Sequence, residues 1–251
     1  MNLDNNFIKT GVFGLILTLI NVGVANGATV NIVTSATNPQ ETVSGIRADT
    51  GTYGTDLVGM LVTAYYDDGS SELLTWQALP GSPGHWLDGG VTSSSINMIA
   101  ADTYDGFQLT TNKLLSSLRL QGAPADSIFD MGTASSGDPG DTPTTKIGFP
   151  FEIVAGGDLL DGIVTASYSG IVNIAGRAAD GDAYTDLFID FSAVTDRGLL
   201  GYLEFRSDMD TLAVSGDLTS VSPVPLPASL PFLAVGLAGF GLIRRRKISS
   251  N

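Results

Sequence analysis

The sequence contains no cysteine, a single histidine and few basic residues. Without cysteine the chain forms no disulfide, holds no thiolate-bound zinc and has no cysteine nucleophile. Any histidine-dependent mechanism must use His85, which lies in the turn-rich string GSPGHW. The 251 residues include 12 basic and 26 acidic ones, so the net charge is −14. Because phosphate binding needs a basic surface, we expect no nucleic-acid partner.

The N-terminal residues 1–28 have the three parts of a secretory signal peptide. A short polar start, Met1–Lys9, precedes the uncharged apolar run Thr10–Ala25, which we expect to form a signal helix. This run is shorter than the roughly 20 residues of a membrane span. Ala25 and Gly27 are small enough to occupy the −3 and −1 positions for cleavage after Gly27, and cleavage after Ala25 stays open. We therefore expect signal peptidase to remove this segment, the alternatives being an uncleaved anchor or a buried helix.

A second uncharged segment lies near the C-terminus, within residues 223–251. Prolines keep its first part extended, and Leu230–Ile243 is entirely apolar or small. A helix from Ser229 into the following basic cluster has about 18 residues and a length of about 27 Å, enough for a short span of a bacterial inner membrane. We expect a single transmembrane helix here.

A basic cluster follows this apolar run directly. Its members are Arg244, Arg245, Arg246 and Lys247. The positive-inside rule keeps such a cluster in the cytoplasm. Together with an N-terminal export signal, this orientation places residues 29–222 outside the inner membrane.

The string before the apolar run carries a family resemblance. It reads Val224, Pro225, Leu226, Pro227 and Ala228. With the span and the basic cluster it resembles the tail of the PEP-CTERM family of exosortase substrates, in the variant where V-P-L-P-A replaces Pro-Glu-Pro. The resemblance covers Val224–Lys247, about a tenth of the chain.

This resemblance implies a Gram-negative bacterium with exopolysaccharide or biofilm systems. It also implies that an exosortase-like membrane transpeptidase of the cysteine type recognises the motif and removes the span. The precursor would be held in the inner membrane, and the mature protein would be released or attached at the cell surface, with exopolysaccharide as a further partner. Two alternatives are a Gram-positive sortase substrate, from the imperfect L-P-x-T-G match at Leu226–Leu230, and an anchor that is never processed.

The region between the two ends, residues 29–222, is the expected mature domain. It holds 25 acidic and 7 basic residues, a net charge of about −18. Short runs with period-2 alternation, bounded by glycine, aspartate, serine and proline, predict about a dozen strands. Among these expected strands are Phe107–Thr111, Leu114–Leu120, Ser127–Met131, Leu199–Arg206 and Thr211–Leu218. The clearest hairpin joins Leu57–Tyr66 to Ser71–Ala78 through Asp-Asp-Gly-Ser. We therefore predict an all-β, antiparallel, jelly-roll-like β-sandwich.

Alternation also predicts which side chains form the core. In the string LFIDF, we expect Leu187, Ile189 and Phe191 to face inward, and Asp186 with Phe188 and Asp190 to face outward. The two tryptophans, Trp76 and Trp86, are predicted to be core or rim residues. Exposed tryptophans would instead favour a sugar-stacking surface.

The sequence contains no recognisable set of catalytic residues. His85 has no nucleophile motif near it, and most aspartates stand beside glycine or serine, the pattern of turns. A glycosidase needs a positioned carboxylate pair, and glutamates are scarce. We therefore expect a protein that is not an enzyme.

Calcium is the one metal that the sequence favours. Asp180, Asp182 and Asp186 stand at offsets 0, 2 and 6 of a loop, and hard oxygen ligands at alternating positions suit Ca²⁺. The loop lacks the EF-hand glycine and glutamate. Two smaller acidic groups are Asp208 with Asp210 and Asp138 with Asp141. The alternative is a solvated acidic surface that keeps the protein soluble.

Three functions remain open from these observations. The first is a structural or interaction protein of the cell envelope. The second is an extracellular carbohydrate-binding sandwich, which an exposed face carrying Trp76, Trp86, Tyr65 or Tyr104 would favour. The third is a hydrolase, which would need convergent carboxylates or His85 beside a nucleophile.

Overall fold

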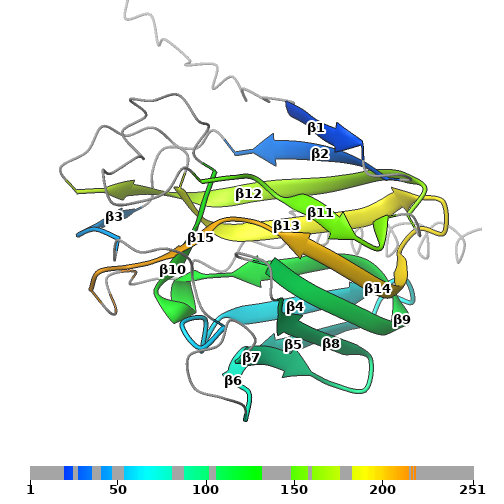
Figure 1. The fold of residues 1–251 in the computed structure, drawn as a ribbon, viewed down its shortest axis with the longest axis horizontal. Helices are drawn as coiled ribbons and strands as arrows, with labels where there is room; N and C mark the ends of the chain where they lie inside the picture. Colours follow the sequence, from blue (N-terminus) through cyan, green and yellow to red (C-terminus); the bar gives the residue numbers. More distant parts are fainter. Residues whose placement is uncertain are drawn as a thin grey trace, which may run out of the picture. The chain divides into compact units, whose positions relative to one another are not determined.

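The protein is all-β (Figure 1). The computed structural model describes residues 20–24, 28–35, 41–46, 54–80, 88–101, 106–131, 148–157, 160–175, 183–214, 216 and 218. These residues form fifteen strands and one 3₁₀ turn, η1 (Ala123–Ala125), without an α-helix among them. They belong to one compact unit, Met1–Thr219, and Ser220–Asn251 make up a second unit that lies outside the described residues.

All fifteen strands belong to one large, mixed sheet. In chain order they are β1 (Ile20–Val24), β2 (Ala28–Thr34), β3 (Glu41–Val43), β4 (Leu61–Tyr66), β5 (Ser71–Thr75), β6 (Gln77–Ala78), β7 (Gly89–Thr92), β8 (Ile96–Ala100), β9 (Gly106–Gln121), β10 (Ser127–Asp130), β11 (Glu152–Ala155), β12 (Gly162–Ile174), β13 (Ala183–Val194), β14 (Leu199–Arg206) and β15 (Met209–Thr211).

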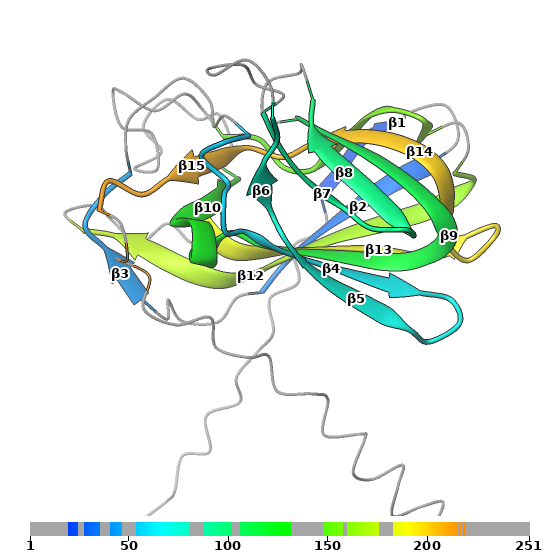
Figure 2. The same ribbon diagram turned by 90° about the horizontal axis from the view of Figure 1, so that it is seen from below.

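Strand β9 divides this sheet into two halves (Figure 2). Its first part, Gly106–Thr111, pairs with β8 and β14. Its last part, Leu115–Gln121, pairs with β4 and β13. We call the two sides the β8 half, which comprises β6, β7, β8, β14 and β11, and the β13 half, which comprises β5, β4, β13, β12, β2 and β1. One long, bent strand thus connects both halves, and its pairing with β14 is irregular between Thr111 and Leu115.

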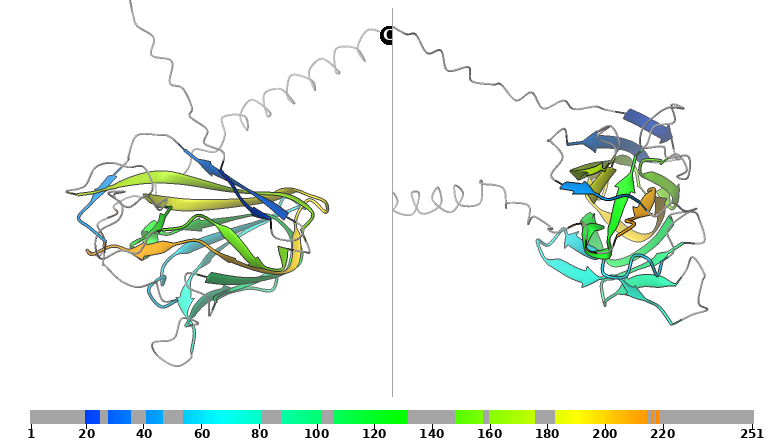
Figure 3. Two further views of the ribbon diagram at one scale, coloured as in Figure 1. Left: turned by 45° about the horizontal axis from the view of Figure 1, so that its top comes forward. Right: turned by 90° about the vertical axis from the view of Figure 1, so that its left-hand side faces the viewer.

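The inward faces of both halves contribute to one hydrophobic core, and Figure 3 shows the strands that surround it. Leu187, Ile189 and Phe191 of β13 are fully buried, and Phe188 on the opposite face is half-buried. The predicted inward set is therefore confirmed, whereas Asp186, expected to face outward, is only 9% exposed. Trp76 is also fully buried, its ring meeting Phe107 edge-on with 5.7 Å between centroids.

The hairpin formed by β4 and β5 has the predicted turn, but its strands are shorter than expected. The first strand begins at Leu61 instead of Leu57, and the second ends at Thr75 instead of Ala78. Tyr65 pairs with Ser71 across the turn, and Gly69 has a φ of +80°. Asp68 accepts a hydrogen bond from the backbone N–H of Ser70 at 3.0 Å, which closes the turn locally. Because glycine and aspartate supply both features, the sequence alone was sufficient to locate this hairpin.

Three features of the sheet differ from the expectation. We expected only antiparallel pairing, but β12 pairs in parallel with β2 and with β3. The two strands expected at Phe107–Thr111 and Leu114–Leu120 are one strand, β9, which runs from Gly106 to Gln121. The last expected strand, Thr211–Leu218, is instead the short β15, which ends at Thr211.

Most of both predicted targeting segments lies outside the described residues. Within the expected signal helix the structure describes only Ile20–Val24, and these residues form β1, paired with β2. In the part of the chain that the structure describes, no helix has the length and apolar character of a membrane span.

Candidate metal centre

Three aspartates meet where β10 and β15 run side by side. Asp130 ends β10, Asp210 lies in β15, and Asp208 stands just before it. The two strands are antiparallel with Phe129 opposite Met209, and the N–H of Asp130 donates to the carbonyl of Asp208 at 3.1 Å. This register sets Asp130 across from Asp208, and period-2 alternation turns Asp210 to the same side. One carboxylate oxygen from each residue lies within 4.8 Å of the others.

The cluster is buried. Asp130, Asp208 and Asp210 are 6%, 4% and 8% exposed. The Oδ2 atom of Asp210 is fully enclosed and accepts no hydrogen bond. Other atoms of Asp210 do interact with neighbouring groups. The backbone at Gly148 closes one side, since a Cβ there would lie 2.7 Å from Oδ1 of Asp130. A larger residue at this position would displace the Asp130 carboxylate.

A buried tyrosine and serine hold the chain that leads into the cluster. The Tyr168 hydroxyl accepts a hydrogen bond from the N–H of Phe151 at 2.7 Å and shares a second one with Ser207 Oγ at 2.8 Å. Burial raises the pKa of Tyr168 well above its ordinary value, and the nearby charge of Asp208 raises it further. The phenol therefore stays neutral, and the position of Asp208 next to Ser207 is fixed.

Because like charges in a buried site repel each other, carboxylates this close must either be partly protonated or bind a positively charged group. A calcium ion meets that need, since it takes six to eight oxygen ligands and accepts carboxylates and backbone carbonyls together. The three aspartates would supply the charged ligands, with carbonyl oxygens or water completing the shell. Magnesium would require a stricter octahedral arrangement.

The calcium loop predicted from the sequence is placed only in part. Asp180 and Asp182 lie outside the described residues. Asp186 forms an ion pair with Arg119, whose Nε donates to Oδ1 at 3.0 Å. Its other oxygen accepts a hydrogen bond from Thr185 Oγ1 at 2.6 Å. Asp186 is thus engaged with a cation of its own sheet and is not a member of the cluster.

Sequence reasoning paired Asp208 with Asp210 but missed Asp130. The first two share a short acidic string, whereas Asp130 is far away along the chain and comes next to them only through the β10–β15 pairing. A period-2 pattern does not reveal which strands are neighbours. The one available signal was position: Asp130 is the second-last residue of the expected strand Ser127–Met131, and Asp208 and Asp210 lie between the last two expected strands.

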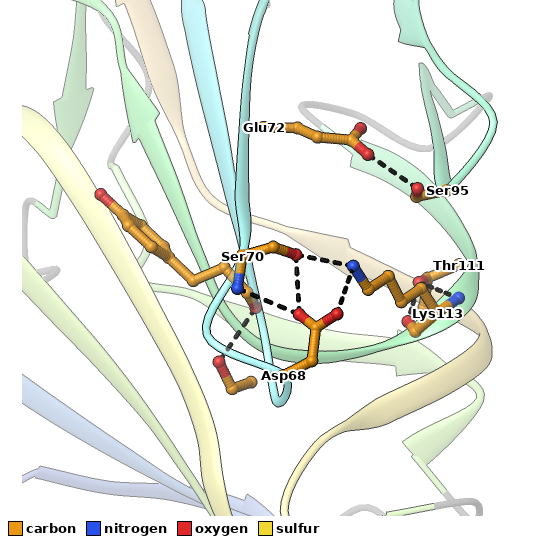
Figure 4. A network of polar contacts seen from close by, with 8 residues as sticks. Asp68, Ser70, Glu72, Ser95, Thr111 and Lys113 are labelled. Carbon is orange, nitrogen blue, oxygen red and sulfur yellow. Dashed lines mark hydrogen bonds and ion pairs between the residues drawn. The ribbon is translucent and has the colours of Figure 1, made fainter.

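A second polar network lies at the β4–β5 turn (Figure 4). Lys113 Nζ lies 2.6 Å from Ser70 Oγ and 2.8 Å from Asp68 Oδ2. The hydrogen bond from Lys113 lowers the pKa of Asp68 far below its ordinary value, and Ser70 lowers it further. These contacts tie the hairpin to β9, the strand that carries Lys113.

Glu72 extends this network toward the turn between β7 and β8. Its two carboxylate oxygens accept hydrogen bonds from Ser93 Oγ at 2.6 Å and Ser95 Oγ at 2.7 Å. These bonds lower the pKa of Glu72, the one from Ser93 contributing most. The ionised Glu72 carboxylate therefore has a structural role. By accepting these two hydrogen bonds it fixes the β7–β8 turn against β5.

Of the other predicted residues, Trp76 is buried and donates to the carbonyl of Gly54 at 2.8 Å, and Tyr65 is half-buried. The remainder lie outside the described residues: His85, Trp86, Tyr104, Ala25, Gly27, the motif Val224–Ala228 and the basic cluster Arg244–Lys247.

Comparison of the chain with protein-family models, with curated proteins and with solved structures found no significant match. Its function is therefore inferred from its own residues.

Proposed function

We propose that the protein is exported and sorted to the cell surface or extracellular matrix, where its acidic β domain has a structural or interaction role and is not an enzyme. The observation that carries this proposal is the tail, in which a V-P-L-P-A string, an uncharged span and an RRRK cluster follow one another. The signal-like N-terminal segment supports the same destination.

The domain itself is best described as a jelly-roll-like β-sandwich. Two observations support this description: both halves of the sheet bury their inward faces in one core, and β9 takes part in each half. The described polar networks at Lys113 and Glu72 brace turns, which fits a structural role.

The sorting proposal is tested by following the mass and location of the protein. The full chain is expressed in a Gram-negative host that has an exosortase-like transpeptidase, and residues 224–228 are replaced by a neutral Gly/Ser linker. We expect the wild-type protein to lose both ends and leave the inner membrane, and the variant to keep its C-terminal segment and stay there. Intact-mass measurement of fractionated cells distinguishes the two.

The matched control carries the same linker at residues 135–139, in the stretch rich in serine, glycine and aspartate. It should be processed like the wild type. Unchanged processing of the 224–228 variant would show that the motif is not a sorting signal.

We also propose that Asp130, Asp208 and Asp210 hold a structural calcium ion, supported by the mutual distances and burial of their carboxylates. Calcium that binds only the folded state at about 100 times its Kd adds about 2.7 kcal/mol of stability. For a domain of this size that raises the melting temperature by about 5–10 °C. Scanning calorimetry of the full chain in calcium and in EDTA measures the difference.

The calcium response should disappear in Asp210→Asn and persist in Asp196→Asn, since Asp196 is exposed at a turn. The comparison uses the response to calcium within each variant, so a general loss of stability does not affect it. Equal melting temperatures of the wild type in calcium and EDTA would refute the site.

A further inference from the structure

Strand β1 covers one edge of the sheet and lies inside the segment that signal peptidase is proposed to remove. Among the described strands β1 pairs with β2 only, and β2 pairs on its other side with β12 (Figure 1). Cleavage after Ala25 or after Gly27 would separate the two strands, because both bonds lie between β1 and β2. The inference below rests on this proposed cleavage, which turns β2 into an edge strand; we call its residues Ala28–Thr34 the β2 edge.

The backbone of β2 shows which kind of strand this edge accepts. Directly after β2, the N–H of Ser35 donates to the carbonyl of Tyr168 in β12 at 3.0 Å. Backbone groups of consecutive strand residues point to opposite edges, and the register between β2 and β12 is unbroken. The N–H and C=O groups of Val30 and Ile32 therefore point toward β1, which runs antiparallel to β2. After cleavage these groups need a new partner.

The β2 edge carries none of the devices that keep edge strands apart. Such strands are usually protected by lysine, proline or inward-pointing charges. The sequence of β2, ATVNIVT, contains no charged residue and no proline. Val30 and Ile32 are buried in the core, and Thr29, Asn31 and Val33 on the outward face are uncharged. The edge is thus a neutral strip on a strongly acidic domain.

A second copy of β2 matches the strand that covers this edge in the structure. The register sets Ile20–Val22 against Val30–Ile32, with Asn21 opposite Asn31. Another β2 strand, antiparallel and centred on Asn31, would bring the string Val-Asn-Ile to the same place. Valine and isoleucine would again stand opposite Val30 and Ile32, and asparagine opposite Asn31. A twofold axis normal to the sheet relates the two copies, so that their inward residues lie on the same side.

We propose that two mature chains associate through their β2 edges, antiparallel and with Asn31 opposite Asn31 of the second copy. The two sheets then continue into each other, and the contact is complete at two chains because it is isologous. Seven residues from each chain form a small contact beside the roughly 1,200 Å² of a stable interface. The dimer is therefore weak and depends on concentration.

Sedimentation velocity of the processed protein tests this association. The protein is recovered from the exosortase-containing host, its N-terminus is fixed by intact mass, and it is run over a wide range of concentrations. We expect a monomer that becomes a dimer as the concentration rises. Added salt should strengthen the dimer, because it screens the repulsion between two acidic chains.

The mass measurement separates the two proposals. A processed protein that stays monomeric at every concentration would overturn the dimer and leave the export proposal intact. A protein that keeps residues 1–27 would contradict both, since β1 would still cover the β2 edge.

Asn31→Asp and Asn31→Lys test the register. Each variant places two like charges directly opposite each other at the centre of the contact, so each should weaken self-association by about fivefold or more. An equal mixture of the two variants brings opposite charges together and should form a dimer that neither forms alone. Such recovery also excludes misfolding as the cause, because an unfolded variant could not be rescued by the other.

Ser167→Asp is the matched control, because it adds the same charge as Asn31→Asp. Ser167 lies in β12 opposite Val33, half-buried on the same outward face but one strand inside the edge. Its copy in the second chain is not opposite it, so we expect this variant to associate like the wild type. Equal weakening in Ser167→Asp, no weakening in either Asn31 variant, or no recovery in the mixture would each contradict the proposed pairing.

Discussion

Replacing Phe205 by alanine is expected to lower the free energy of unfolding by about 3–5 kcal/mol. Phe205 is fully buried in β14, where its ring stacks on Phe107 at 5.2 Å and lies 5.4 Å from Phe151. The substitution removes the centre of three packed rings and leaves a cavity that rigid strands cannot close. Since domains of this kind are stable by about 5–15 kcal/mol, a large share of the stability would be lost.

Urea denaturation of the full chain measures this change as a lower midpoint with an unchanged slope. Leu200→Ala is the control in the same strand, because Leu200 is 58% exposed, and it should change stability by no more than about 0.5 kcal/mol. If Phe205→Ala cost no more than Leu200→Ala, the aromatic cluster would not be what holds β14 to the core.

Replacing Gly170 by alanine is expected to cost about 2–4 kcal/mol through two additive effects. Gly170 has a φ of +75°, which an L-residue adopts only at a cost. A Cβ there would also lie 2.0 Å from Thr185 Oγ1, so the threonine must rotate and give up its hydrogen bond to Asp186. The ion pair between Asp186 and Arg119 would be disturbed as well.

Gly201→Ala separates the two effects. Gly201 also has a positive φ, +104°, but nothing lies within 4 Å of the position that a Cβ would take. Its replacement should therefore cost only the backbone contribution of about 1–2 kcal/mol. In a Thr185→Ala background, Gly170→Ala should cost no more than Gly201→Ala, and an unchanged cost would show that the clash with Thr185 is unimportant.

The hairpin and the strand faces could be predicted because their causes are local. Asp68 and Gly69 fix the β4–β5 turn by their own hydrogen bonds and backbone angles. Leu187, Ile189 and Phe191 recur at every second position, and this larger apolar set decides which face of β13 is buried. Neither feature needs knowledge of a partner strand.

The candidate metal centre and the contact between Tyr65 and Phe188 could not be predicted in the same way. Asp130 joins Asp208 and Asp210 only because β10 pairs with β15. Tyr65 of β4 lies beside Phe188 of β13 because both strands pair with the same segment of β9. Pairing between distant strands depends on the packing of the whole core, and many pairings are compatible with one period-2 pattern.

The sequence by itself determined the all-β class, the turn at Asp68–Gly69, the inward set of β13 and the strongly acidic character of residues 29–222. It also contains the two terminal segments on which the proposed export and sorting rest. The tertiary structure alone decided that β12 pairs in parallel with β2 and β3, that β9 bends through both halves, and which carboxylates and rings become neighbours. Turn chemistry and alternation are properties of adjacent residues, whereas these contacts arise only when strands far apart in the chain bury their faces in a common core.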